Sequence, residues 1–260
     1  AGGNRSRAGG SQLPSVGERR WWPAYGLALL AFAAALLSKT VTCTLPAALL
    51  LIIWWKRPRL RLRDVLPVVP LFVLGAALSL VTWGIESKLI GGATVRAAFT
   101  PVDRILIAGR ALWFYLGTLL LPLNLVHVYP RWTIDPHAAW QYLYPVAAGV
   151  LAVVLWLARR RIGKSPLAAF LYYGGTLAPT LGLINFGFMD HSFVADRFQY
   201  LPSLGIIALV VAALAAAAQL LVAPPQARAG VDRGQQIGHR IAVVFHEFAV
   251  AGGIDHVAVV

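Results

Sequence analysis

The residues best suited to chemistry lie immediately before the last long apolar run of the chain. Asp196, Arg197 and Tyr200 stand at its edge, and Asp190 and His191 occupy the polar loop ahead of them. Ionisable side chains at the edge of a long apolar segment are costly to hold and usually mark a functional site. Arginine holds phosphate through two hydrogen bonds at once, and a carboxylate can accept a proton. We therefore expect an anion-binding polar site here.

Two further cations stand in comparable places. Lys39 lies in a polar hinge between two short apolar runs, and Arg131 lies in a loop among aromatic residues. An unpaired charge between apolar helices is costly, so Lys39 and Arg131 are phosphate-binding candidates together with Arg197. The alternatives stay open: Lys39 extends along its own stem to the membrane interface, and Arg197 pairs with a nearby aspartate to anchor a helix end.

The candidate acids and histidines carry a weaker signal. Asp135, Asp190 and Asp196 are equally suited to outer-loop salt bridges or to helix N-caps, and Asp196 directly precedes a helix. His137 and His191 lie near Asp135 and Asp190, but no metal-binding spacing of histidines occurs. We predict no metal site.

The composition places these residues in a membrane protein. Hydrophobic residues make up 58% of the chain and charged residues 13%, whereas soluble domains carry about 25% charge. The mean hydropathy is +0.69. A membrane crossing needs roughly 20 apolar residues and at least about 17. Apolar runs cover residues 24–37, 45–55, 65–83, 105–126, 143–158, 166–184 and 201–223. Five of these reach or nearly reach that length, and the first two form a short pair around residues 38–40.

The net charge of +13 is arranged as membrane anchors and not as a nucleic-acid surface. Basic residues gather directly before or after apolar runs, at positions 19–20, 56–63 and 159–164. This is the pattern of cytoplasmic flanks under the positive-inside rule. Because no soluble domain remains to carry a nucleic-acid interface, we predict no nucleic-acid partner.

The same rule creates one topological conflict. If both later basic clusters are cytoplasmic, residues 85–142 contain no net crossing, although residues 105–126 are long enough to span. Either this run is re-entrant or interfacial, which we favour, or it crosses and one basic cluster lies on the unexpected side. The predicted fold is an all-α polytopic membrane bundle of about six crossings plus one re-entrant or interfacial helix.

We predict three regions and one shared polar face. Residues 1–20 form a flexible segment, residues 21–223 the transmembrane domain, and residues 224–260 a poorly ordered tail. The predicted topology brings the polar segments 38–44, 128–137 and 185–200 to one outer face, which makes this face the expected floor of the site.

Four short stretches resemble one family in order and spacing. They are Asp-Arg-Phe-Gln-Tyr-Leu-Pro at 196–202, Leu-Ser-Lys-Thr-Val-Thr at 37–42 with Leu-Pro at 45–46, Ala-Gly-Arg-Ala-Leu-Trp-Phe-Tyr-Leu at 108–116 with Pro-Leu-Asn-Leu at 122–125, and Tyr-Pro-Arg-Trp at 129–132. Together they make residues 21–220 similar to bacterial tetratricopeptide-repeat multi-spanning membrane proteins. These in turn resemble the transmembrane and tetratricopeptide-repeat protein O-mannosyltransferases.

The resemblance implies a glycosyltransferase of the C-type membrane fold. Such enzymes transfer a sugar from a polyprenyl-phosphate donor to an acceptor, a protein among the candidates, on the outer face of the membrane. It implies the bacterial inner membrane as location, membrane lipid and the lipid-linked sugar as partners, and no cofactor. It also implies a catalytic carboxylate upstream of this chain and repeats downstream, so we expect the chain to be inactive alone.

Two other classes of function remain open. The first is a non-catalytic membrane anchor for a tetratricopeptide-repeat interaction domain, which would tolerate loss of Arg197 and Lys39. The second is a transporter or flippase subunit, which would bury charges within its helices and show inverted repeats. The charges of this chain lie at the ends of its apolar runs instead.

Overall fold

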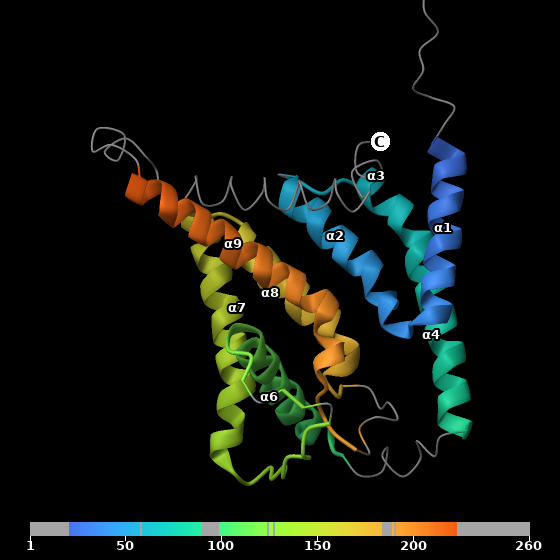
Figure 1. The fold of residues 1–260 in the computed structure, drawn as a ribbon. Coiled ribbons are helices and arrows are strands. Elements are labelled where there is room, and N and C mark those ends of the chain that lie inside the picture. The colour runs from blue at the N-terminus through green and yellow to red at the C-terminus, as the bar shows by residue number, and fades with distance from the viewer. Residues whose placement is uncertain are drawn as a thin grey trace, which may run out of the picture.

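The computed structural model describes residues 21–57, 59–89, 99–123, 125–126, 128–183, 189 and 191–222. The predicted N-terminal segment 1–20 and tail 224–260 lie outside these residues. The described part of the chain is all-helical, as predicted, and contains no strand. Its helices form two groups that lie side by side in Figure 1. One group is built from the first half of the sequence and the other from the second half.

The first group surrounds a small apolar core. Phe32 and Leu36 pack against Val68 and Leu71, and the Tyr25 hydroxyl donates a 2.6 Å hydrogen bond to the Pro67 carbonyl. The elements of this group are α1 (Trp21–Ser38), the 3₁₀ helix η1 (Thr40–Thr44), α2 (Leu45–Lys56), α3 (Leu62–Val65), the 3₁₀ helix η2 (Leu66–Val68) and α4 (Val69–Leu89).

The predicted hinge between the first two runs is confirmed. Helix α1 ends at Ser38, and Lys39 has an extended backbone with φ −151°. Pro46 then lies in the first turn of α2, where its missing N–H is not needed. The polar residues of the hinge therefore separate two helices that are each shorter than a full crossing.

The second group holds the larger core. Tyr115 and Ala111 of α6 pack against Tyr173 and Leu177 of α8 and against Ile206 of α9, and all five are buried. The elements are α6 (Pro101–Leu120), the 3₁₀ helix η3 (Ala139–Tyr142), α7 (Leu143–Ile162), α8 (Ser165–Leu177), the 3₁₀ helices η4 (Ala178–Thr180) and η6 (Asp196–Phe198), and α9 (Tyr200–Val222).

Glycine permits the closest helix contacts in this group. A Cβ atom on Gly109 would lie 2.6 Å from the Pro145 backbone nitrogen, so α6 and α7 touch backbone to ring at this point. A Cβ on Gly205 would lie 2.8 Å from the Tyr172 ring and 3.1 Å from the Ala169 carbonyl. These two positions fix how α6 meets α7 and how α8 meets α9.

Two of the predicted long runs are shorter as helices. The run 105–126 is helical only to Leu120, and the run 166–184 leaves the α-helix at Leu177. Pro122 explains the first end, because proline disfavours a helical conformation in the residue before it, and Leu121 has left the helical region. At the second end Ala178 keeps a helical backbone, but Pro179 has no N–H to continue the α-helical hydrogen bonds, and the chain goes on as the 3₁₀ helix η4. Gly182 then adopts φ +83°, which ends the second run in a turn.

Three helical segments are long and apolar enough to cross a membrane by length and composition: Leu62–Thr82, Ala139–Ile162 and Tyr200–Ala218. The segments Trp22–Ser38 and Thr40–Lys56 are apolar but shorter. Three of the predicted runs are thus candidate crossings in the described part of the chain, and the count of about six crossings stays a prediction. The described chain is an all-helical membrane protein with three candidate spanning helices.

The two later basic clusters lie at the same end of the molecule, which we call the basic end. The Lys164 ammonium donates hydrogen bonds of 3.3 Å to the Trp54 carbonyl and 3.1 Å to the Arg57 carbonyl. Helix α6 lies in the half away from this end, whereas α7 beside it runs the full height (Figure 1). This arrangement contradicts the alternative in which residues 105–126 cross the membrane and the two basic clusters lie on opposite sides. The re-entrant or interfacial position of α6 stays a prediction.

Candidate functional site

A pocket with a mostly apolar lining and two cations lies where the two helix groups meet, away from the basic end. Its volume is about 200 Å³, and its lining includes the predicted site residues Lys39, Arg197 and Tyr200. Val41, Thr42, Phe198 and Leu201 complete the lining. The ends of α1 and α2 beside it stop short of the lower ends of α4 and α7 (Figure 1).

Lys39 is positioned by its own backbone. Its N–H donates to the Ala35 carbonyl at 2.8 Å, and its carbonyl accepts from the Thr42 N–H at 3.0 Å and the Thr42 hydroxyl at 2.8 Å. The side chain is exposed, and the ammonium makes no hydrogen bond or ion pair with any residue that the structure describes. Its charge is therefore available to a ligand in the pocket.

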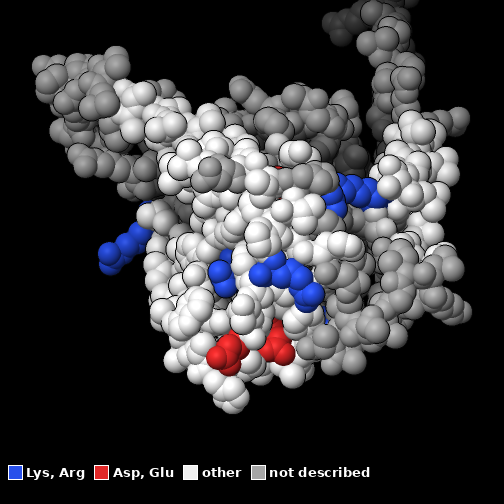
Figure 2. Space-filling model, turned by 60° about the horizontal axis from the view of Figure 1, so that its bottom comes forward, with Lys and Arg blue, Asp and Glu red and all other residues white. Residues whose placement is uncertain are grey.

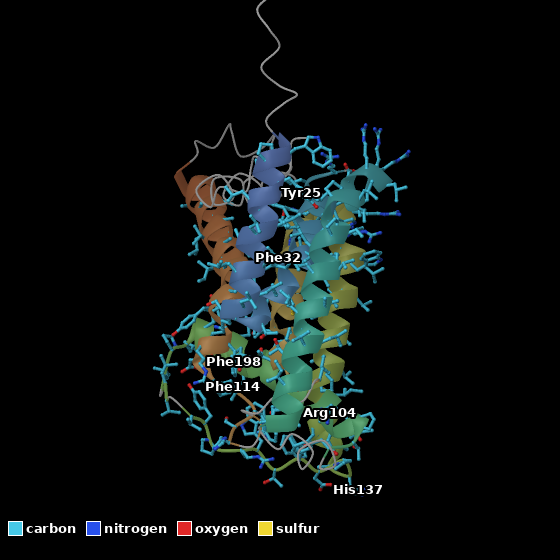
Figure 3. All side chains as sticks on the ribbon, turned by 90° about the vertical axis from the view of Figure 1, so that its right-hand side faces the viewer. Tyr25, Phe32, Arg104, Phe114, His137 and Phe198 are labelled. Atoms are coloured by element: carbon cyan, nitrogen blue, oxygen red, sulfur yellow. The ribbon has the colours of Figure 1, made fainter. Side chains whose placement is uncertain are left out.

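Arg197 is positioned by a buried anchor two residues earlier. The Ala195 N–H donates a 3.0 Å hydrogen bond to the Tyr115 hydroxyl of α6, and both residues are buried. The guanidinium lies 5.2 Å from the centre of the Phe198 ring, and Phe198 packs on the same core as Phe114 (Figure 3). Since α6 carries this anchor, the position of Arg197 depends on the packing of the second helix group.

Asp196 does not cap a helix, which was one interpretation of its position. The Tyr129 hydroxyl donates to its carboxylate, with 3.0 and 3.1 Å to the two oxygens. Tyr129 also accepts a 3.4 Å hydrogen bond from the Val126 N–H. Partial burial, and then the neighbouring Asp196 carboxylate, raises the pKa of Tyr129. The phenol therefore stays protonated and holds the acid directly before Arg197.

Arg131 lies apart from the pocket lining. Its guanidinium sits 5.2 Å from the Phe193 ring centre and 5.8 Å from that of Phe99. The neighbouring Trp132 carries Arg110 at 4.5 Å. These cation–π contacts hold the two guanidinium groups against rings that are buried or half-buried. Figure 2 shows basic side chains gathered on this lower face with acidic ones beside them.

The remaining candidates lie on this face or outside the described residues. His191 is exposed, and Asp190 lies outside the described residues. The Asp135 carboxylate accepts a 2.9 Å hydrogen bond from the His137 N–H, which is a local turn contact. The His137 side chain lies at the lower edge of the molecule (Figure 3). Among the described residues, no group of three or more His, Cys, Asp or Glu is placed to hold a metal ion.

Sequence reasoning missed the two tyrosines that build the site. Tyr129 stands in a stretch noted above for its resemblance, but nothing in its spacing indicates a contact with Asp196. Tyr115 lies on the buried face of α6, where its hydroxyl needs a partner. The sequence offers one signal for such a role, which is a tyrosine such as Tyr115 among the apolar residues on one face of a helix.

The pocket has the chemistry of an anion site. It combines an ammonium, a guanidinium and, at Tyr200, a phenol on an exposed side chain, and apolar residues flank them. By its chemistry, such a set is suited to a phosphate or carboxylate attached to an apolar body. In comparisons with known proteins, no family model, no curated protein and no solved structure matches this chain. Fold and site thus define a helical membrane protein with a cation-lined pocket.

Proposed function

We propose that this chain is part of a membrane glycosyltransferase that transfers a sugar from a polyprenyl-phosphate donor to an acceptor on the outer face of the membrane. The observation that carries the proposal is the pocket in which Lys39 and Arg197 meet, although they lie far apart in the sequence. Two cations in an apolar setting suit a lipid phosphate as leaving group. The resemblance of the four sequence stretches to O-mannosyltransferase-like proteins supports the same chemistry.

In this proposal the pocket faces the outer side and the basic end faces the cytoplasm of a bacterial inner membrane. Six helices cross: α1, α2, α4, α7, α8 and α9. Helix α6 lies at the interface, which agrees with its two charged residues in the first turn and Arg110 at mid-length. The short helices α1, α2 and α8 cross with the help of their adjoining 3₁₀ segments.

The residues take separate roles. Arg197 and Lys39 hold the donor phosphate, and Tyr200 donates a further hydrogen bond to it. Asp196, held by Tyr129, keeps Arg197 in place. Arg131 and His191 belong to the acceptor side. The catalytic base is a carboxylate outside this chain.

The test is sugar transfer in membranes that contain the intact protein. Radiolabelled polyprenyl-phosphate sugars are supplied, and transfer is compared between wild type, Arg197→Ala and the matched control Arg63→Ala at the basic end. We expect Arg197→Ala to lower the rate of transfer at least about a hundredfold. The substitution removes a positive charge that stabilises the negative charge of the leaving phosphate in the transition state. Arg63→Ala should remain active.

Each other outcome corrects the proposal. Transfer that survives in Arg197→Ala removes this residue from the donor site. Absence of transfer from every donor, with the protein folded, favours a membrane anchor for a repeat domain. Transport of the lipid-linked sugar across the bilayer without transfer favours the flippase alternative.

A further inference from the structure

The two helix groups are joined at the basic end through two neighbouring residues, Lys164 and Ser165. The Lys164 ammonium donates hydrogen bonds of 3.3 Å to the Trp54 carbonyl and 3.1 Å to the Arg57 carbonyl. It also lies 5.1 Å from the centre of the Trp54 ring. Beside it, the Trp55 indole N–H donates a 3.0 Å hydrogen bond to the hydroxyl of Ser165, which is buried. We call these contacts the clamp.

The local sequence explains both halves of the clamp. Gly163 adopts φ +83°, a conformation that favours glycine, and this turns the chain from the end of α7 into the start of α8. On the other side, the last carbonyls of a helix such as α2 have no partner within their own helix and carry the negative end of its dipole. A cation donates hydrogen bonds to these carbonyls and balances the dipole. Lys164 of one group therefore caps a helix of the other.

Away from the clamp, the contact between α2 and α8 is incompletely packed. Contacts of α8 with α2 and η1 are the main direct packing between the two helix groups in the described residues. Separate gaps interrupt this contact. One, of about 10 Å³, is lined by residues that include Ile52 and Ala168, and another, of about 50 Å³, by residues that include Ala48 and Gly175. Atoms beside a void lose dispersion contacts, so apolar packing alone holds α2 against α8 less firmly than a filled interface would.

The other end of α2 carries one wall of the anion pocket. The 3₁₀ helix η1 leads directly into α2, and Lys39 and Val41 line the pocket from this side. Arg197 comes from the second group, where the Tyr115 hydroxyl anchors its segment. The separation of Lys39 and Arg197 therefore depends on how α2 is held against α8.

The length of α2 makes the pocket sensitive to the clamp. Helix α2 contains 12 residues and is about 18 Å long at roughly 1.5 Å per residue. A tilt of about 5° about the clamp would move η1 by roughly 1.5 Å relative to the second group. A cation must lie within about 2.9 Å of a phosphate oxygen to form a charge-assisted hydrogen bond. A shift of this size therefore removes one of the two contacts that the pocket offers to a phosphate.

We propose that Lys164 is a positioning residue for the pocket. Its clamp on the end of α2 sets the separation of Lys39 and Arg197, and with it the affinity of the pocket for a phosphate attached to an apolar chain. The identity of this ligand rests on the proposed function, whereas the effect of the clamp on the separation does not.

The separation is tested by pulsed electron paramagnetic resonance between nitroxide labels at Leu37 on α1 and Val146 on α7, in a Cys43→Ala background. Both labelled positions are exposed. Lys164→Met removes the ammonium, and Arg161→Met is the matched control. Arg161 is exposed and makes no hydrogen bond or ion pair with a described residue. We expect the distance distribution to broaden by about 1–2 Å in Lys164→Met, as the length of α2 implies, and to stay as in wild type in the control.

The affinity is tested with farnesyl phosphate as the probe, at a temperature at which every variant is folded. We expect Lys164→Met to weaken binding at least about tenfold, which corresponds to the loss of one charge-assisted hydrogen bond. Arg161→Met should bind as wild type does, and the charge-preserving Lys164→Arg should recover most of the affinity. Ser165→Ala removes the acceptor of the Trp55 indole and should change both measurements in the same direction by less. It replaces Lys164→Met in both experiments if that variant does not fold.

A purely stabilising role of Lys164 would lower the Tm of Lys164→Met but leave the distance distribution and the affinity of the folded protein unchanged. This result, or an equal change in Arg161→Met, would overturn the proposal. If wild type binds no farnesyl phosphate while Lys164→Met broadens the distribution, the clamp is supported and the ligand of the proposed function is wrong. If wild type binds the probe and Lys164→Met changes neither measurement, the proposed function remains and Lys164 is no positioning residue.

Discussion

The two ends of this molecule use positive charge in different ways. In the pocket, Lys39 and Arg197 converge on one cavity, and the segment that carries Arg197 is anchored through buried hydrogen bonds and core packing. At the basic end, the cations stand at helix termini, where Lys164 binds two carbonyls at the end of α2 and Arg57 forms a salt bridge with Asp64. Two cations from distant segments can share one pocket only if packed helices hold those segments in place. Cations that stand singly at helix ends need no such support. The difference predicts that substitutions in the framework of the pocket cost more stability than substitutions at the basic end.

The largest effect is expected from the α6–α7 contact. Gly109→Ala places a Cβ 2.6 Å from Pro145 and forces the two helices apart, at a cost of about 3 kcal/mol. Gly117→Ala on the same helix meets no atom within 4 Å and should be neutral or stabilising by up to about 1 kcal/mol. Thermal unfolding in a mild detergent measures both. Equal Tm values for the two variants would contradict the close approach of α6 and α7.

Next is the buried anchor of the Arg197 segment. Tyr115→Phe leaves the buried Ala195 N–H without its acceptor, at a cost of about 1–3 kcal/mol. Hydrogen exchange should rise in residues 194–198 before it rises elsewhere. The control is Tyr142→Phe, which removes a hydrogen bond from an exposed hydroxyl to the Pro136 carbonyl. Should exchange in 194–198 stay at the wild-type rate, Tyr115 does not anchor the pocket.

A smaller effect is expected from Tyr129→Phe, which removes the hydrogen bond to Asp196. Because the pair is only partly buried, we expect a loss of about 1 kcal/mol. The pKa of Tyr129 is raised in the folded protein. Its stabilising contribution is therefore complete below the unfolded pKa of about 10 and is lost as pH rises through the folded value.

Unfolding of wild type and Tyr129→Phe, measured between pH 7 and pH 11, checks this direction. The difference between them should be constant up to about pH 9 and shrink above it. A difference that grows with pH would mean that the phenolate form is the one stabilised in the folded protein.

The smallest effect is expected at the basic end. In uncharged detergent without added lipid, R160Q/R161Q should change the free energy of unfolding by less than about 0.5 kcal/mol, as exposed surface substitutions do. Arg160 and Arg161 are exposed. If R160Q/R161Q lowered the free energy of unfolding as much as Tyr115→Phe does, both ends would contribute equally to stability. The proposed difference between the two ends would then be wrong.

The sequence by itself determined the features that arise from neighbouring residues. The hinge at residues 38–40 follows from a polar break before Pro46, and the apolar runs at 45–55, 143–158 and 201–223 became helices within a few residues of their predicted bounds. The two runs that were too long fail for a local reason as well, since Pro122 and Pro179 shorten them. Helix formation and helix ends are local properties, so local patterns predict them.

Only the tertiary structure decided which of the polar residues meet. The Tyr129–Asp196 contact joins residues 67 apart, and the Tyr115–Ala195 contact joins residues 80 apart. Lys39 and Arg197 come to one pocket while Arg131 packs on aromatic rings beside it. In the sequence the three cations look alike, because each stands beside an apolar or aromatic stretch. What separates them is the packing of whole helices, such as the approach at Gly109, and no spacing within one segment records it.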